Sequence, residues 1–397
     1  MAGAIDLTRP YLVVPKLIEQ PTWGGTYIVT SKGWDKHKNF GSLLIGQSYE
    51  LFSGSNLSLL NSSADAKFMG ELTDNTAVAH PTAPAHTIPL AALIEASPDE
   101  TLGREVTTVR GPHIQLLIKY TQALGNSFQV HIKDGVKFNR WEPKPESWYY
   151  FEPGLVTLGV KPGISWNAYH QAVTAISEGA TSLSRHVKVG TITYDQGHAE
   201  LQKLIAKHDP WQFVNTVPVK AGQLVDMSSG GIHHSWEEDP HRAPLGNVLY
   251  EIQHEALDTV STFRNFDKGK MEPDGSLRPL QIDEYFDAID HSPAANDPGN
   301  HLRNPEPRAV TASFRLDALL NSRHYSLDKL TLAGPGASFS ESLSRFKHFF
   351  VKSGQVKITA GGHAVTVTSA HSCFIPAAAG KYTIKNLADH SEILISY

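Results

Sequence analysis

The chain has 397 residues and one cysteine, with 35 Lys and Arg against 40 Asp and Glu. This length predicts two or three domains with large cores that need no disulfides. The net charge of −5 argues against nucleic acid or an anionic membrane as the main partner. Because Cys373 is the single cysteine, the chain cannot form a cysteine-based zinc cluster by itself. A transition metal would therefore be held by imidazole, carboxylate or amide groups, and 20 histidines are present.

The first residues show no targeting signal. Met1 to Pro10 lack a basic stretch followed by an apolar one, so we expect no signal peptide. The chain has no run of ~18 apolar residues, so we expect no transmembrane helix. We therefore predict a cytoplasmic protein without membrane or nucleic-acid partners.

In chain order, short β-type runs come first, punctuated by Gly and Pro, and a short helix is expected at 90–95. Helical spacing marks 165–178 and 197–208, within a predicted helical insertion over 163–216. Residues 291–304 have the composition of a linker. From 305 to 397, apolar and polar residues alternate between turns, which predicts an antiparallel jelly roll.

The segment 127–132 is a strand by pattern. Phe128, Val130 and Ile132 fall on one face, and Gln129 and His131 fall together on the other. An amide oxygen and an imidazole side by side are a possible start for a metal site, although a polar pair on a strand face is more often simply solvated.

Two later segments supply further donors. Glu146 opens an aromatic strand, where it is either a surface carboxylate or a group near a buried face. Gly230-Gly231 precede Ile232, His233 and His234, and two glycines allow a turn that brings the next histidine close to another strand. The alternative is a hairpin with exposed histidines.

Taken together, the motifs resemble the type I phosphomannose isomerases, a zinc-dependent cupin family, and the similarity covers most of the chain. The order Gln-x-His, Glu-x-Trp-Tyr, Gly-x-Ile-His and Tyr-Glu-Ile-Gln follows the family pattern. The matching segments are Pro15 with Trp23-Gly24-Gly25, Ile45 to Glu50, Leu116 to Lys119, Lys144 to Glu146, Tyr250 to Gln253, Asp258-Thr259, Arg264 to Asp267, and Arg278 to Asp283.

The resemblance implies a mainly β fold: two cupin/jelly-roll β-sandwich domains with a small α-helical insertion. The catalytic cupin would comprise 1–162 and 217–290, interrupted by the insertion, and the jelly roll at 305–397 would carry no metal. One zinc ion per chain would be held by Gln129, His131, Glu146 and His233. His234 follows directly and competes for the last position, which the register gives to His233.

The resemblance also implies an aldose–ketose isomerase that interconverts mannose 6-phosphate and fructose 6-phosphate through a cis-enediol. Arg264 would stabilise the enediolate, and either Glu251 or Lys144 would move the proton. Ser127, Lys119 and Asp258 would contact the substrate, with hydroxyl and ammonium groups suited to its phosphate. The partner is thus a small sugar phosphate, and we expect a monomer.

The chain departs from the family pattern in three places. Ile132-Lys133 follow His131 where the family often has proline, Ser228-Ser229 precede the two glycines, and His254 stands where Gln or Ser is common. We interpret His254 as a packed imidazole. The alternatives are another cupin that acts on or binds a different sugar phosphate, and a sugar-binding cupin without catalysis.

Overall fold

The computed structural model describes residues 5–36, 40, 42–65, 68, 71–73, 79–80, 87–138 and 140–397. This described chain divides into two compact units. Unit 1 comprises Met1–Gln122, Leu249–Glu255 and Arg303–Tyr397, and unit 2 comprises Ala123–Val248 and Ala256–Leu302. The domain boundaries predicted from the sequence stay a prediction.

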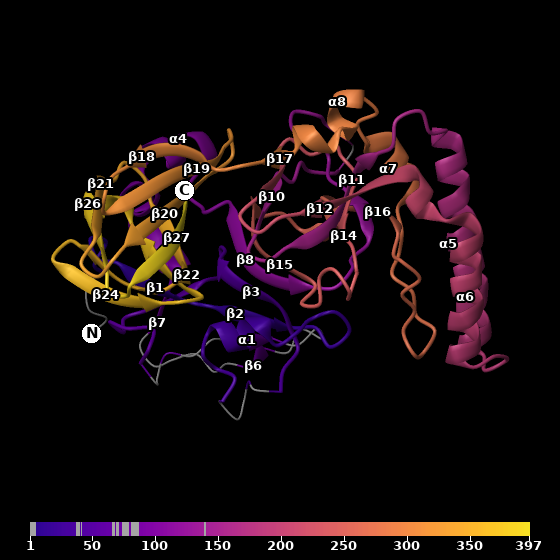
Figure 1. Ribbon diagram of the computed structural model, residues 1–397, viewed down its shortest axis with the longest axis horizontal. Helices are drawn as coiled ribbons and strands as arrows, with labels where there is room; N and C mark the ends of the chain where they lie inside the picture. Colours follow the sequence, from indigo (N-terminus) through magenta and orange to yellow (C-terminus); the bar gives the residue numbers. More distant parts are fainter. Residues whose placement is uncertain are drawn as a thin grey trace. The chain divides into compact units, whose positions relative to one another are not determined.

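Unit 1 is built on a large antiparallel sheet that joins the start of the chain to its end (Figure 1). Strand β1 pairs with β25 on one side and with β4 on the other, so strands far apart in sequence share one core. The strand order is β18 (Glu306–Val310), β19 (Phe314–Asn321), β20 (Ser326–Ala333), β27 (His390–Ser396), β22 (Lys347–Ser353), β25 (His371–Ile375), β1 (Tyr11–Val14), β4 (Asn56–Ser58), β7 (Thr87–Pro89).

The predicted C-terminal meander is present. In β23 (Gln355–Ala360), Val356 and Ile358 are buried while Lys357 and Thr359 are exposed, as strand alternation requires. Gly361 and Gly362 have positive φ and connect β23 to β24 (His363–Thr368), with Ala360 paired to His363. The second sheet of this region has the order β21 (Ser338–Ser342), β26 (Lys381–Asn386), β23, β24.

Unit 1 also holds a run of strands that carries several predicted site residues. Their order is β15 (Asn247–His254), β8 (Leu116–Ala123), β3 (Ile45–Leu51), β2 (Lys16–Glu19), β5 (Glu71–Thr73), β6 (Ala79–His80), and β2 and β5 pair in parallel. Short helices complete the unit, namely α1 (Tyr27–Ser31), α2 (Leu90–Ala96), α3 (Pro98–Leu102), α4 (Arg104–Arg110) and the 3-10 turn η4 (Ala377–Ala379). The helix predicted at 90–95 is confirmed by α2.

Unit 2 has a sheet of the order β12 (Val214–Val219), β11 (Gly154–Val160), β14 (His234–Trp236), β9 (Phe128–Val130), β16 (Phe263–Phe266). The strands β17 (Leu302–Arg303), β13 (Leu224–Met227) and β10 (Glu146–Tyr150) follow one another in a second sheet. The other elements are η1 (Pro210–Phe213), η2 (Asp258–Val260), α7 (Ile282–Ala288), α8 (Pro293–Asn296) and η3 (Pro298–Asn300).

The predicted helical region forms a hairpin of α5 (Trp166–Lys188) and α6 (Tyr194–His208), longer than the sequence pattern indicated. α5 continues past 178, and Gly179 within it lies against Leu204 of α6: an added Cβ would lie 2.2 Å from Leu204 Cδ2, so the leucine side chain would have to shift. α6 starts before 197 because Thr193 and Gln196 form a reciprocal capping box.

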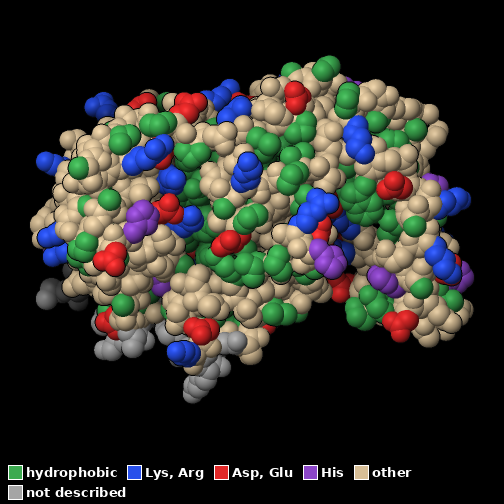
Figure 2. All heavy atoms as spheres, in the orientation of Figure 1, with side chains coloured by type: hydrophobic (Ala, Val, Ile, Leu, Met, Phe, Trp, Pro, Cys, Tyr) green, Lys and Arg blue, Asp and Glu red, His purple; other side chains and the backbone are tan. Residues whose placement is uncertain are grey.

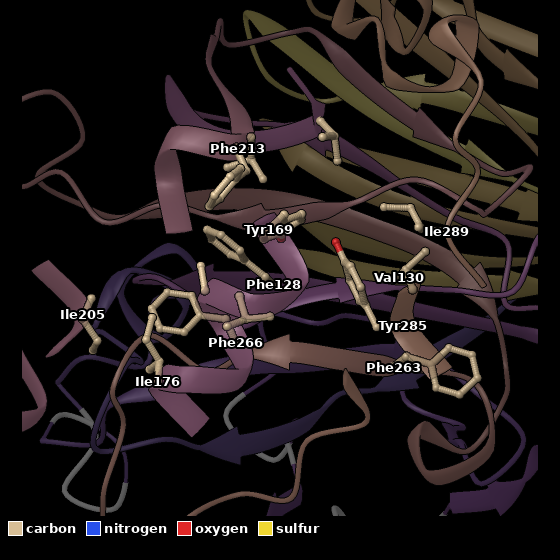
Figure 3. Packing of buried hydrophobic residues seen from close by; sticks show 14 of the residues in the cluster. Phe128, Val130, Tyr169, Ile176, Ile205, Phe213, Phe263, Phe266, Tyr285 and Ile289 are labelled. Atoms are coloured by element: carbon tan, nitrogen blue, oxygen red, sulfur yellow. The ribbon is translucent and has the colours of Figure 1, made fainter. Parts of the chain in front are cut away.

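The core of unit 2 is aromatic. Phe128 and Val130 of β9 meet Tyr169 of α5, Phe266 of β16 and Tyr285 of α7 in one buried cluster (Figure 3). The helical hairpin therefore covers the face of the β9 sheet from which Phe128 projects, which leaves the other face for polar side chains.

On the face shown in Figure 2, acidic and basic side chains are interspersed, in keeping with the small net charge. Within the described residues, no helix is long and apolar enough to cross a membrane. The mainly β fold with a small helical insertion is confirmed.

Candidate metal centre

Strand register gathers four predicted or competing site residues of unit 2 on one sheet face. Gln129 of β9 lies directly opposite His234 of β14, and on its other side it lies opposite Arg264 of β16. His131 follows Gln129 by two residues and so shares its face. Directly opposed residues in antiparallel strands point the same way, so this face carries an amide, two imidazoles and a guanidinium.

His131 is held in one orientation by its backbone surroundings. Its Nδ1 lies 2.8 Å from the Ser261 carbonyl oxygen, which can only accept, so Nδ1 carries the proton. Nε2 then faces the site, 3.2 Å from Oε2 of Glu146. A ligating histidine usually donates its other ring N–H in this way.

Glu146 stands at the start of β10 with its side chain only 3% exposed. Its Oε1 accepts a 2.6 Å hydrogen bond from Trp148 Nε1, and its Oε2 lies 3.4 Å from Lys144 Nζ. Burial by itself raises the pKa of Glu146, but Lys144 and the contact with His131 outweigh burial and hold the pKa well below its usual range. The carboxylate is thus ionised and fixed at both oxygens.

His234 lies beside this pair. Its ring centroid is 5.1 Å from that of His131 and 5.1 Å from that of Trp148. Burial is the main cause that lowers the pKa of His234 to about 3, so its imidazole is neutral, as a metal ligand must be. Within the described part of the chain, its buried Nδ1 has no hydrogen-bond partner.

His233 points away from this group. Its ring packs edge-on against Phe128 at 4.5 Å and against Tyr285 at 5.8 Å, inside the aromatic core. Neither ring nitrogen has a hydrogen-bond partner among the residues described, and burial holds the pKa of His233 well below its usual range. The geometry therefore does not support the prediction that His233 completes the ligand set, because its ring lies in the aromatic core while His234, the first residue of β14, lies opposite Gln129.

The turn before these histidines depends on its glycines. Gly230 and Gly231 both have positive φ, and a Cβ on Gly230 would lie 2.5 Å from the carbonyl oxygen of Ile132. The turn thus runs close to the residues that follow β9. From the sequence, His234 was the competing ligand, and the pairing of β14 with β9 places His234 opposite Gln129.

The residues present fit a zinc ion. Two ligands of a tetrahedral zinc at ~2.0–2.1 Å lie about 3.3 Å apart. The 3.2 Å between His131 Nε2 and Glu146 Oε2 matches one such edge. Two lone pairs at this distance also repel unless a cation or a proton lies between them. In the described residues, no three His, Cys, Asp or Glu side chains form a ready-made metal cluster, so the close contact within the donor set is the one between His131 and Glu146.

Ser127 and Gln129 are coupled, since Ser127 Oγ donates to Gln129 Oε1 at 3.3 Å. This bond orients the amide and leaves the phosphate contact predicted for Ser127 without support from the structure. Arg264 stands on the same sheet face, and its backbone N–H donates to Gln281 Oε1.

Lys119 and Glu251, which were also predicted as site residues, belong to unit 1. Lys119 of β8 donates to Glu251 Oε1 at 2.9 Å and to Gln253 Oε1 at 3.1 Å. The structure thus brings Lys119 and Glu251 together as a buried ion pair. His254 lies near the ring of His324, at 6.5 Å between centroids. The side chain of Asp258 lies outside the described residues.

The fold belongs to a known class. Double-sheet jelly rolls of antiparallel strands include the cupins. No family model matches the sequence, and no curated protein matches it closely enough to be counted as a relative. Solved structures, in contrast, match almost the whole chain.

These structures are mannose 6-phosphate isomerases. The enzyme from Bacillus subtilis is 16% identical over 98% of this chain and 99% of its own, with a TM-score of 0.65. A zinc-bound mannose 6-phosphate isomerase is 12% identical over 98% and 99%, with a TM-score of 0.63. The apo form from Salmonella typhimurium is 12% identical over 98% of each chain, with a TM-score of 0.61. The likeness shows that this chain has their cupin fold, as the motifs indicated.

Proposed function

We propose that this protein is a zinc-dependent aldose–ketose isomerase that interconverts mannose 6-phosphate and fructose 6-phosphate. The observation that carries the proposal is the group formed by His131, Glu146 and His234, with Gln129 directly opposite His234. All four donors are nitrogen or oxygen, and the solved structures with this fold include a zinc-bound one. His234 replaces His233 in the ligand set.

The two imidazoles, the carboxylate and the amide would hold one zinc ion. When bound, zinc supplies a Lewis acid that polarises the sugar carbonyl and orients the neighbouring hydroxyl. The Ser261 carbonyl, Trp148 and Ser127 hold three of these ligands in place through their other polar atoms. Such supporting contacts orient the ligands and keep the donor atoms aimed at one point.

The chemistry at the sugar is a proton transfer between C1 and C2. The Arg264 guanidinium provides fixed positive charge where the enediolate oxygen develops. A base must take the proton from one carbon and return it to the other. The candidates remain Lys144, which lies 3.4 Å from a ligand carboxylate, and Glu251, which is ion-paired with Lys119.

Substrate contacts through Lys119, Ser127 and Asp258 are part of the proposal, as are the monomeric state and the cytoplasmic location. Lys119 is the residue best suited to a phosphate group, because its ammonium is already desolvated and charged hydrogen bonds to phosphate are strong. When substrate binds, the Lys119 ammonium would have to donate both to Glu251 and to the phosphate.

The test is a coupled assay that follows fructose 6-phosphate formed from mannose 6-phosphate, with zinc content measured on the same sample. We expect one zinc per chain, loss of turnover after chelation, and recovery on zinc addition. His234→Ala should lose zinc and turnover together, while the matched variant His233→Phe keeps both.

Chelator-insensitive turnover would contradict a zinc mechanism. Full zinc content in His234→Ala together with zinc loss in His233→Phe would return the ligand role to His233. Bound zinc without turnover on mannose 6-phosphate would favour a cupin for another sugar phosphate, or a binding protein.

A further inference from the structure

A cavity of about 300 Å³ lies in unit 2 between α5 and the segment 265–280. Its lining includes Ile176, Thr181 and Lys188 from α5, and Asn265, Asp267 and Arg278 from the facing segment. None of the proposed zinc ligands lines it. The cavity is therefore a feature of the molecule that the isomerase proposal does not use.

The segment that covers the cavity is anchored to the helical hairpin, beside which it runs in Figure 1. At its far turn, Ser184 Oγ of α5 donates to the Gly275 carbonyl at 2.6 Å. At its start, Gly269 has positive φ, and an added Cβ there would lie 2.5 Å from Ile205 Cδ1 of α6. Because contacts hold the covering segment at both places, the cavity is a fixed part of the fold.

Two acceptors at the cavity wall lack donors. Asn265 is fully buried, and its Nδ2 donates to the Tyr169 hydroxyl at 2.9 Å. This bond fixes the orientation of the amide, and Oδ1 is its other polar atom. Among the residues described, neither Asn265 Oδ1 nor Asp267 Oδ1 has a hydrogen-bond partner. Buried acceptors without donors are costly, so a ligand with hydroxyl groups would satisfy them.

The charges at the wall favour an anion. Lys188, Lys270 and Arg278 line the cavity together with a single carboxylate, Asp267. Arg278 Nη1 lies 3.6 Å from Asp267 Oδ1, too far for a hydrogen bond, and the Arg278 side chain is 49% exposed. A guanidinium in this position can still donate a bidentate pair of hydrogen bonds to a phosphate or carboxylate.

The cavity lies on the opposite face of the β9 sheet from the zinc ligands. Asn265 faces α5 through its bond to Tyr169, whereas the preceding Arg264 shares the face of Gln129. A ligand in the cavity would thus contact the back of the strand that carries Arg264, without reaching the metal ligands.

We propose that this cavity is a second binding site, for a small phosphorylated polyol. The hydroxyls of the ligand donate to Asn265 Oδ1 and Asp267 Oδ1, and its phosphate pairs with Lys188 and Arg278. The volume is at the lower end of the ~300–1,000 Å³ range of small-molecule sites, so the ligand is smaller than a nucleotide. The proposal stands independently of the isomerase activity.

The test uses the zinc-loaded protein and sn-glycerol 3-phosphate as the probe, with isothermal titration calorimetry and hydrogen exchange. We expect saturable binding with a Kd below ~1 mM and slower exchange in the segment 265–280. Glycerol without the phosphate should not bind measurably. Inorganic phosphate should bind at least ~10-fold more weakly, because it leaves the two acceptors unsatisfied.

Two variants locate the site. The surface variant Lys188→Gln/Arg278→Gln should bind the probe at least ~10-fold more weakly, and Ala180→Leu, which fills the cavity, should abolish binding. Lys203→Gln is the matched control, since this exposed α6 lysine pairs with Glu200 and does not line the cavity. Thermal melting confirms that each variant is folded.

Binding to His234→Ala separates this site from the metal centre. If His234→Ala still binds the probe, the result supports the cavity as the binding site. If it does not, the probe occupied the metal centre and the proposal is overturned. The absence of probe binding to the unmodified protein would also overturn it, as would equal affinity for inorganic phosphate or unchanged affinity in both cavity variants.

Discussion

A buried lysine–glutamate pair of unit 1 and one of unit 2 have different surroundings. In unit 1, Lys32 Nζ lies 2.7 Å from Glu50 Oε1, and the remaining carboxylate positions accept hydrogen bonds from Ser48 and Ser372. In unit 2, Lys144 Nζ lies 3.4 Å from Glu146 Oε2, and that same oxygen faces His131 Nε2.

A buried charged pair can therefore be structural or functional. The Lys32–Glu50 pair is fully enclosed and satisfied by donors from distant parts of the chain, so it needs nothing more. The Lys144–Glu146 pair also contacts His131 Nε2, and the neighbouring His234 Nδ1 has no hydrogen-bond partner within the described chain. A cluster of acceptors in a buried place is the arrangement that a cation completes.

The largest expected effect comes from Glu146→Gln, which removes the charged ligand. We expect zinc to be lost on dialysis and turnover to fall by more than the ~10–100-fold that supporting residues typically cost. Metal analysis and the coupled assay measure both. Glu50→Gln is the matched control. Equal zinc loss in the folded fractions of both variants would show that the Lys144–Glu146 pair has no greater role in zinc binding than the Lys32–Glu50 pair.

The same control variant tests the structural role of the pair in unit 1. Glu50→Gln leaves the Lys32 ammonium buried without its counter-charge, and burial already lowers the pKa of Lys32. We expect the free energy of unfolding to fall by about 3–5 kcal/mol, measured by denaturant unfolding of the zinc-loaded protein. A change below ~1 kcal/mol would show that water reaches this pair.

A smaller effect is expected from Trp148→Phe, which removes the N–H that holds Glu146 Oε1 at 2.6 Å. The carboxylate stays but is less firmly oriented, so zinc affinity should fall by about 10-fold to 100-fold. Competition with a chelator of known affinity measures this. Unchanged affinity would mean that the indole only packs against His234.

The smallest effect concerns pH and a buried histidine of unit 1. Burial lowers the pKa of His348 to about 3, so the folded protein keeps this ring neutral. The unfolded chain takes up the proton near pH 6.5, so stability is lost as the pH falls from there towards 3. His348→Phe should flatten the slope of unfolding free energy against pH by up to about 1.4 kcal/mol per pH unit. An identical slope in the variant would show that His348 does not contribute.

Local patterns predicted much of this molecule. The alternation in β23 and β24, the turn at Gly361-Gly362 and the helix at 90–95 depend on neighbouring residues, and the structure has them. The ends of α5 and α6 were predicted less well: α5 runs on through Gly179, which packs against Leu204 of α6, and α6 begins at its capping box.

The sequence by itself determined that Gln129 and His131 share a strand face, since alternation is a property of the strand. It also showed that any metal must be held without cysteine, because Cys373 stands alone. The tertiary structure decided that His234 faces these donors, because pairing of β14 with β9 places it opposite Gln129 and turns His233 into the aromatic core. Register between strands some hundred residues apart is set by packing and by the turn at Gly230, and a shift of one residue exchanges the two faces.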